Sequence, residues 1–323
     1  MIKNYILKRL LKAIPLLIAL TVTCFFLIHS APYDAIDYIA TPQMTKDALE
    51  RLRRINGLDK PLFIRYLLWV RNLLKGDLGY SIITHESIKT VLAAKIPNTL
   101  ILMVPSYILS NILALTAGLY ASQHVRSRIR KIIDGLVSLG LSVPFFWFCL
   151  LFLYVFGYQL GIFPIAGMHS IGETGALDFL KHYVSPFICL AFAFLPDLFL
   201  YVETSADDEL KKDYVTVQKA MGAADTSILR RHILINVLKP VVTKIGMALP
   251  GMLTGSLIVE TMFAWPGMGS YYVKAIQAMD YPVVMIILLL SGVLVIAGNL
   301  LSDICCFILD PRIRDEHKIE PDR

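Results

Sequence analysis

The chain has 323 residues, of which 56% are hydrophobic and 17% are charged, and its formal net charge is +6. Soluble globular proteins contain about 45–50% apolar and about 25% charged residues, and here the apolar residues come in long blocks. This composition excludes a disordered chain, a collagen and a small disulfide scaffold, and it predicts a polytopic membrane protein.

Several of the apolar blocks are near the length of about 20 residues that a helix needs to cross a bilayer. The first block follows four basic residues, as a signal peptide would, but no clean cleavage site follows it, so we expect a retained helix. Four prolines fall inside the later blocks, where neighbouring helices can satisfy the carbonyls that a proline frees. We predict six membrane-spanning helices, over 13–31, 98–122, 134–158, 184–202, 240–262 and 282–306.

The basic residues predict the orientation of these helices. The short outer loops at 159–183 and 263–281 carry only Lys181 and Lys274. Positive residues are enriched in cytoplasmic loops, so we expect both termini in the cytoplasm. With that orientation, 19 of the 31 Lys and Arg residues lie on the cytoplasmic side, in 1–12, 123–133, 203–239 with Lys244, and 307–323.

The same boundaries divide the chain into four parts. We predict an N-terminal segment with the first membrane helix at 1–31, an outer loop at 32–97, a transmembrane core at 98–306 and a cytoplasmic tail at 307–323. The loop at 32–97 carries ten basic residues on the predicted outer side, but long loops are largely exempt from the rule of positive cytoplasmic loops.

The outer loop has helical signals of its own. Thr45 is placed to cap a helix that ends at Asn56-Gly57, and a second helix runs from Pro61 to Gly76. At about 1.5 Å per residue the second helix is about 22 Å long, too short to cross a bilayer, and its two arginines oppose insertion. It fits an amphipathic helix in the outer membrane interface, or one packed against the membrane-spanning helices.

The cytoplasmic segment at 203–239, called here the 203–239 loop, predicts a helix–turn–helix. The first helix covers 206–221. The acids 207–209 lie near its start, where their negative charge interacts favourably with the helix dipole. Gly222 closes it, Asp225 or Thr226 caps a second helix over 227–238, and Pro240 bounds that helix. A short turn between two membrane helices suits docking of a cytoplasmic partner. The alternative is a solvated loop whose basic residues only follow the orientation rule.

Acids within predicted spans are candidates for a transport pathway, because a charge in a bilayer is costly and usually faces a cavity or a partner. Asp197 lies in the middle of the fourth span, and Glu260 lies at the outer end of the fifth. The alternative for both acids is that they pair with a residue of a neighbouring helix or of another subunit. The turn Trp265-Pro266-Gly267 forms an outer gate or only ends a helix.

Five stretches in order along the chain carry a family resemblance. They are YILKRLLKAIP at 5–15, GLDKP at 57–61 with GDLGYS at 76–81, DYVTVQKAMG at 213–222 with RHILINVLKP at 231–240, ETMFAWPGMG at 260–269, and DPRIR at 310–314. Together they resemble the permeases of ATP-binding-cassette importers, in particular the dipeptide, oligopeptide and nickel branch. The long outer loop is similar to that of the first of the two permeases in such systems. The chain departs from the family pattern at 32–35, at 201–203, at 216–218 and at Met221.

The resemblance implies a permease subunit in a bacterial or archaeal cytoplasmic membrane, working by alternating access. It implies a sister permease, two ATPase subunits that carry ATP and Mg, and an external substrate-binding protein. The implied cargo is a peptide; nickel or a metal chelate is the alternative, and a secondary transporter is a rival of another class. The chain has no GxxxxGK[ST], HExxH or GxSxG motif, so we expect no catalytic residue, cofactor, metal or nucleic acid on it.

The resemblance also implies roles for individual residues. Those expected to couple the chain to the ATPases are Asp213, Tyr214, Ala220, Gly222, Ala223, Ala224, Asp225, Arg231, His232, Asn236 and Pro240. Those expected along the pathway or at its gate are Asp197, Glu260, Trp265, Pro266 and Gly267.

Overall fold

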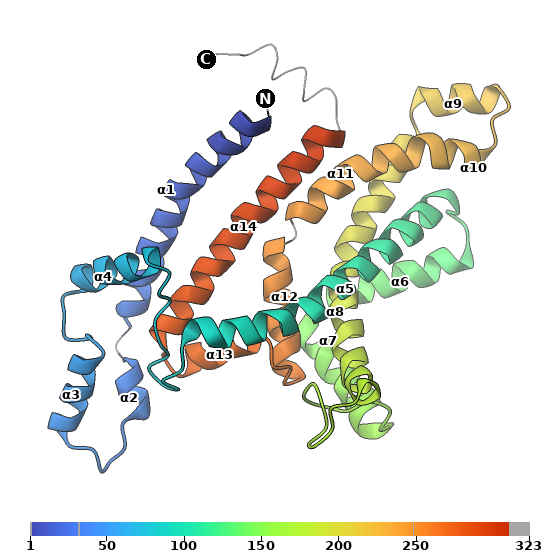
Figure 1. The fold of residues 1–323 in the computed structure, drawn as a ribbon. Helices are drawn as coiled ribbons and strands as arrows, with labels where there is room; N and C mark the ends of the chain where they lie inside the picture. The colour runs from blue at the N-terminus through green and yellow to red at the C-terminus, as the bar shows by residue number, and fades with distance from the viewer. Residues whose placement is uncertain (1, 32, 248, 310–323) are drawn as a thin grey trace. The chain divides into compact units, whose positions relative to one another are not determined.

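The computed structural model describes residues 2–31, 33–247 and 249–309, and every regular element among them is a helix (Figure 1). The predicted all-helical class is confirmed. The chain divides into two compact units, one of Met1–Leu100 with Pro266–Ala297 and the other of Ile101–Trp265 with Gly298–Arg323. Most of the predicted tail at 307–323 lies outside the described residues.

In chain order the helices are α1 Ile2–His29, α2 Ala35–Ile39, α3 Lys46–Ile55, α4 Leu62–Leu74, α5 Ile88–Gln123, α6 Arg128–Ser142, α7 Phe145–Phe152, η1 Leu153–Gln159, α8 Ala176–Leu210, α9 Asp213–Ala220, α10 Asp225–Ile228, η2 Leu229–Ile233, α11 Leu234–Met247, α12 Leu249–Met262, α13 Met268–Gln277 and α14 Tyr281–Leu309. The two η elements are stretches of π-helix, and each directly continues the α-helix before it.

Four of the described helices are long and apolar enough to cross a membrane, namely α1, α5, α8 and α14. They coincide with the first, second, fourth and sixth predicted spans. The fifth predicted span falls on α11 and α12, and residue 248 between them lies outside the described residues. The total of six spans therefore stays a prediction.

The third predicted span is not one continuous helix. Its residues form α6 and then α7 with η1, and the two parts are bent by 111°. Pro144 stands at the break as the N-cap of α7, and Val143 before it is extended. A proline disfavours helical backbone in the residue that precedes it, which explains the break. Pro105 and Pro196, in contrast, lie within unbroken helices.

The outer-loop helices form as predicted, with one addition. The Thr45 hydroxyl accepts a hydrogen bond from the Ala48 amide at 3.3 Å, and Gly57 ends α3 in the left-handed region with φ +66°. The short helix α2 was not predicted. It depends on Asp34, whose carboxylate accepts from two amides of its first turn and from Arg53 of α3 at 3.1 Å. Arg53 also pairs with Asp37 of α2 at 2.5 Å, so its guanidinium holds α2 and α3 together.

Helix α4 packs against α1 within the first unit. The Thr21 and Tyr66 hydroxyls lie 3.1 Å apart, and the Phe25 ring contacts the rings of Tyr66 and Trp69. The prediction that this helix packs against the membrane-spanning helices is therefore confirmed for α1. On other sides of α4, exposed apolar side chains remain, namely Phe63, Ile64, Leu67 and Leu74.

In the second unit, α5 and α8 approach each other closely at Gly118. A Cβ built on Gly118 would lie 2.7 Å from Val202 Cγ1 and 3.2 Å from the Glu203 amide nitrogen. Arg130 of α6 joins the same region, because its guanidinium pairs with Glu203 at 2.7 Å and donates to the Ala121 carbonyl at 2.8 Å. This is the base from which the 203–239 loop projects.

We expect Gly118→Ala to destabilise the protein by about 1–3 kcal/mol, because the branched Val202 side chain has no room to move away from an added methyl group. Gly135→Ala is the matched control, since Gly135 is also helical and nothing lies within 4 Å of its added Cβ. The control should be neutral or slightly stabilising. Thermal unfolding of both variants in detergent measures the difference, and equal midpoints would contradict the close packing.

Candidate functional site

The 203–239 loop is a helix–turn–helix that stands on the membrane helix α8. Figure 1 shows α9 and α10 at one end of α8, with α11 returning beside it. Gly222 has φ +84°, so the predicted left-handed glycine at the turn is confirmed. Between α10 and α11 the backbone passes through the π-helix η2. Such π-helical insertions occur mostly as single turns and frequently at functional sites.

The helix boundaries differ from the predicted ones in three ways. The predicted helix 206–221 is divided at Lys211 and Lys212, so the acids 207–209 lie in the last turn of α8 and not at a helix start. The N-cap of α10 is Ala224, which has no capping side chain, in place of Asp225 or Thr226. The backbone of α11 continues through residue 240 to Met247, so Pro240 does not bound the helix; its side chain lies outside the described ones.

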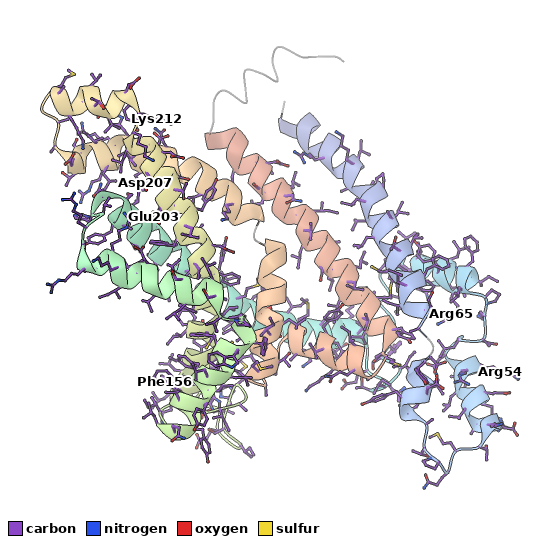
Figure 2. The ribbon with its side chains drawn as sticks, turned by 180° about the vertical axis from the view of Figure 1, so that it is seen from behind. Arg54, Arg65, Phe156, Glu203, Asp207 and Lys212 are labelled. Atoms are coloured by element: carbon purple, nitrogen blue, oxygen red, sulfur yellow. The ribbon has the colours of Figure 1, made fainter. Side chains whose placement is uncertain are left out.

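Glu209 joins the three parts of the loop. Its carboxylate accepts a hydrogen bond from the Tyr214 hydroxyl of α9 at 2.8 Å and from the Asn236 amide of α11 at 3.1 Å. It also pairs with Lys212, the N-cap of α9, which Figure 2 labels. Only 9% of Glu209 is exposed. Charge-assisted hydrogen bonds are about twice as strong as neutral ones, so this carboxylate sets the angle between α8, α9 and α11.

The inner side of the loop is a packed core. Val215, Ile228, Ile233 and Val237 are buried together with apolar residues of α5 and α8. Above this core, Gln218 Nε2 and His232 Nε2 lie 3.1 Å apart and connect α9 with η2. The sequence motif residues Tyr214, His232 and Asn236 thus face inward and hold the loop together.

The tip of the turn is not covered by any other part of the chain that the structure describes. Residues 219–226 are all exposed, and Met221 is 81% exposed. Lys219 and Asp225 form an ion pair of 3.0 Å across the turn. The exposed range thus includes the predicted coupling residues Ala220, Ala223 and Ala224, and Asp213 and Arg231 outside this range are exposed as well. A rigid base with a small, fully exposed tip is suited to insertion into the surface of another protein.

Asp197 is an exposed acid in the middle of α8. Lys244 of α11 donates to the backbone carbonyl of Asp197 at 3.3 Å, and its ammonium lies 4.6 Å from the centre of the Tyr201 ring. Lys244 therefore covers the surface of α8 around Asp197 and Tyr201. It forms no direct ion pair with the Asp197 carboxylate. An exposed acid in a membrane-spanning helix is a candidate for a polar pathway or a partner subunit.

The residues around the end of α12 are in a different setting. Glu260 and Trp265 are fully buried, and the Trp265 amide donates to the Glu260 carbonyl at 2.8 Å. The Trp265 ring packs against Phe179 and Tyr183 of α8. Trp265 thus follows the end of α12 and is packed against α8, and its role at a gate stays a prediction.

Pro266 and Gly267 belong to the first unit. There the Pro266 carbonyl accepts from Asn98 at 3.1 Å, and Gly267 is the N-cap of α13. The five predicted pathway residues therefore do not form one cluster within a single unit.

The role of Glu209 is not predicted by the local sequence pattern. Three successive acids are typical of a helix start, so the pattern places the acidic run 207–209 there. The signal that distinguishes Glu209 is its spacing, since it lies five residues before Tyr214 in the motif. Only the return of α11 brings Asn236 to the same carboxylate.

Comparisons with known proteins cover nearly the whole chain. The family model for the inner membrane component of binding-protein-dependent transport systems matches residues 114–315, and the model for the N-terminal region of such membrane components matches residues 1–103. The "Oligopeptide transport system permease protein AppB" of Bacillus subtilis is 34% identical over 96% of this chain and 98% of its own length.

Two other relatives and a solved structure agree with this. The "Dipeptide transport system permease protein DppB" of Lactococcus lactis is 33% identical, and the "Glutathione transport system permease protein GsiC" of Escherichia coli is 31% identical; each covers 96% of this chain and 99% of the relative. A chain of the MetNI methionine ABC transporter, in an inward-facing conformation, matches with a TM-score of 0.53 and 17% identity over 69% of this chain and 97% of that one. This last likeness concerns the fold.

Proposed function

This chain belongs to the family of inner membrane components of binding-protein-dependent transport systems, and we propose that it is one of two permeases in an ATP-driven importer of peptides. It is a multi-pass membrane protein. A sister permease completes the pathway, two ATPase subunits dock on the cytoplasmic side and hold ATP and Mg, and an external binding protein delivers the cargo.

The observation that carries the proposal is the exposed tip of the 203–239 loop on a rigid base. Movement of an ATPase bound at residues 219–226 is transmitted to α8 and α11, because Glu209 and the buried core leave the loop little freedom to bend. The membrane helices then change between two discrete packings, one open to each side. The coupling residues divide into an exposed docking set around Gly222 and an inward-facing set around Asn236.

The orientation follows from the distribution of basic residues and from this loop. An ATPase partner is cytoplasmic, so the 203–239 loop, both termini and most of the Lys and Arg residues lie on that side. The outer loop with α2, α3 and α4 then faces the binding protein. Asp197, exposed on α8, faces the pathway or the sister permease.

Peptide cargo is supported over nickel by the names of the relatives. The three relatives described above are named for oligopeptide, dipeptide and glutathione transport. The selectivity of the complex is set mainly by its external binding protein.

Reconstitution tests this proposal. The tagged chain is purified from its own host with its co-purifying subunits and placed in liposomes, with the binding protein added outside. We expect uptake of labelled short peptides that requires ATP inside. Uptake of Ni²⁺ but not of peptides would contradict the proposed cargo, and uptake driven by an ion gradient without ATPase subunits would contradict the importer class.

A further inference from the structure

One feature of the first unit that the transport proposal does not use is a cavity of about 500 Å³. Its walls come from α4, from the ends of α1 and α14, and from the segments around 55–60 and 77–82. This volume is within the about 300–1,000 Å³ that is typical of small-molecule sites.

The position of the cavity relative to a membrane follows from two of its lining residues. His29 ends the candidate span of α1, and Tyr281 begins that of α14. Both line the cavity, so it lies where two membrane helices leave the hydrocarbon layer. Trp69, Tyr80 and Tyr281 line it as well, and such amphipathic aromatic rings are typical of the level of the lipid headgroups.

The charge of the cavity wall is positive. Arg65 and Lys60 line it against one acid, Asp77. One oxygen of Asp77 already accepts a hydrogen bond from the Gly79 amide at 2.9 Å. With His29 neutral, the formal charge of the wall is therefore +1.

Lys60 of this wall is exposed, and the part-buried cation of the wall is Arg65. Figure 2 labels it on α4. Among the described residues no hydrogen bond or ion pair to its guanidinium is formed, and the acid nearest to it in charge effect, Asp34, pairs with Arg53 at 3.1 Å. Burial lowers the pKa of the half-buried Arg65, and Asp34 and Tyr281 oppose this effect only in part, so the charge needs further compensation in this environment. A bound anion would supply it.

We propose that this cavity binds the phosphate of an anionic lipid headgroup, with Arg65 as its main ligand. A guanidinium matches phosphate oxygens with two parallel hydrogen bonds, and Lys60 adds a second positive charge. The headgroup level of the cavity favours a lipid over a dissolved ligand. So do the apolar side chains Ile55, Leu68 and Met285 of the cavity wall, because they can contact the first carbons of the acyl chains.

Native mass spectrometry of the intact complex tests this inference independently of the cargo. The complex is titrated with phosphatidylglycerol, and with diacylglycerol of the same acyl chains as the control that lacks the phosphate. We expect Arg65→Gln to lower bound phosphatidylglycerol about tenfold, and Arg65→Lys to restore part of it. Arg71→Gln is the matched variant, because Arg71 is exposed on the same helix and does not line the cavity. It should change binding less than about twofold.

Equal retention of phosphatidylglycerol in the Arg65→Gln and Arg71→Gln variants would overturn the inference, as would equal binding of the two lipids by the unmodified complex. Displacement of the lipid by a peptide with a free carboxylate, but not by its amide, would assign the cavity to a peptide instead. If Arg65→Gln does not assemble, Trp69 is a second reporter, because it lines the cavity. Short-chain phosphatidylglycerol should then change the fluorescence of the unmodified complex and not that of Trp69→Phe; the same change in both overturns the inference.

Discussion

Replacement of Glu209 by alanine is expected to abolish most ATP-driven uptake while the chain still inserts into the membrane. The substitution leaves the Tyr214 hydroxyl and the Asn236 amide without their acceptor and removes the ion pair with Lys212. A buried donor left unsatisfied costs about 1–3 kcal/mol. The loss falls on the junction between α8, α9 and α11, which is the connection that must stay rigid for force to reach the membrane helices.

The matched control is Asp208→Ala. Asp208 is the neighbouring acid, its side chain is 70% exposed, and its contact with Lys211 at 3.9 Å is a solvent-exposed pair. Exposed pairs of this kind contribute about 0–1 kcal/mol, so the control should keep nearly normal uptake. Glu209→Gln should be intermediate, because an amide still accepts a hydrogen bond but has no charge. Measurements are peptide uptake and ATP hydrolysis in liposomes, and we expect hydrolysis to continue while uptake falls about tenfold or more, the factor that 1.4 kcal/mol produces.

A double-mutant cycle separates the role of Glu209 from general damage. If Glu209 acts through Asn236, the effects of Glu209→Ala and Asn236→Ala on the free energy of unfolding are not additive. Additive effects, or equal losses of uptake in Glu209→Ala and Asp208→Ala, would contradict the role that we assign to this carboxylate.

Gly222→Asp is expected to remove ATPase docking without unfolding the loop. Nothing lies within 4 Å of an added Cβ on Gly222, so the substitution meets no steric clash in this chain. Its left-handed backbone, with φ +84°, adds a strain of about 1 kcal/mol for a residue other than glycine. If the tip inserts into an ATPase subunit, the added carboxylate has to be buried at that interface, which costs far more than the strain.

Gly172→Asp controls for the backbone strain. Gly172 has the same φ of +84°, and nothing lies within 4 Å of its added Cβ, but it belongs to the predicted outer loop. We expect the ATPase subunits to co-purify with the Gly172→Asp variant as with the unmodified chain, and about tenfold less with Gly222→Asp. Unchanged co-purification and uptake in Gly222→Asp would show that the tip is not the docking surface.

Local signals in the sequence predicted several elements correctly because each signal acts over a few residues. Thr45 caps its helix through an amide three residues away, and Gly222 ends α9 through its own freedom to adopt positive φ. The break at Pro144 was missed, although the signal was present. Pro144 and Pro196 both lie in apolar blocks, so the sequence does not distinguish them. In the structure the helix is continuous through Pro196, where it packs against Gly140.

What the sequence by itself determined is the class of protein and the order of its parts. Apolar block lengths, basic residues between blocks and short motifs are properties of segments, so they can be read before the segments meet. The contact between Glu209 and Asn236 was decided by the tertiary structure alone, because α11 returns beside α8 and brings Asn236 to a carboxylate 27 residues earlier. The cavity around Arg65 likewise needs two helices more than 200 residues apart in the chain. Contacts between distant segments depend on how the helices pack, and no local pattern contains that information.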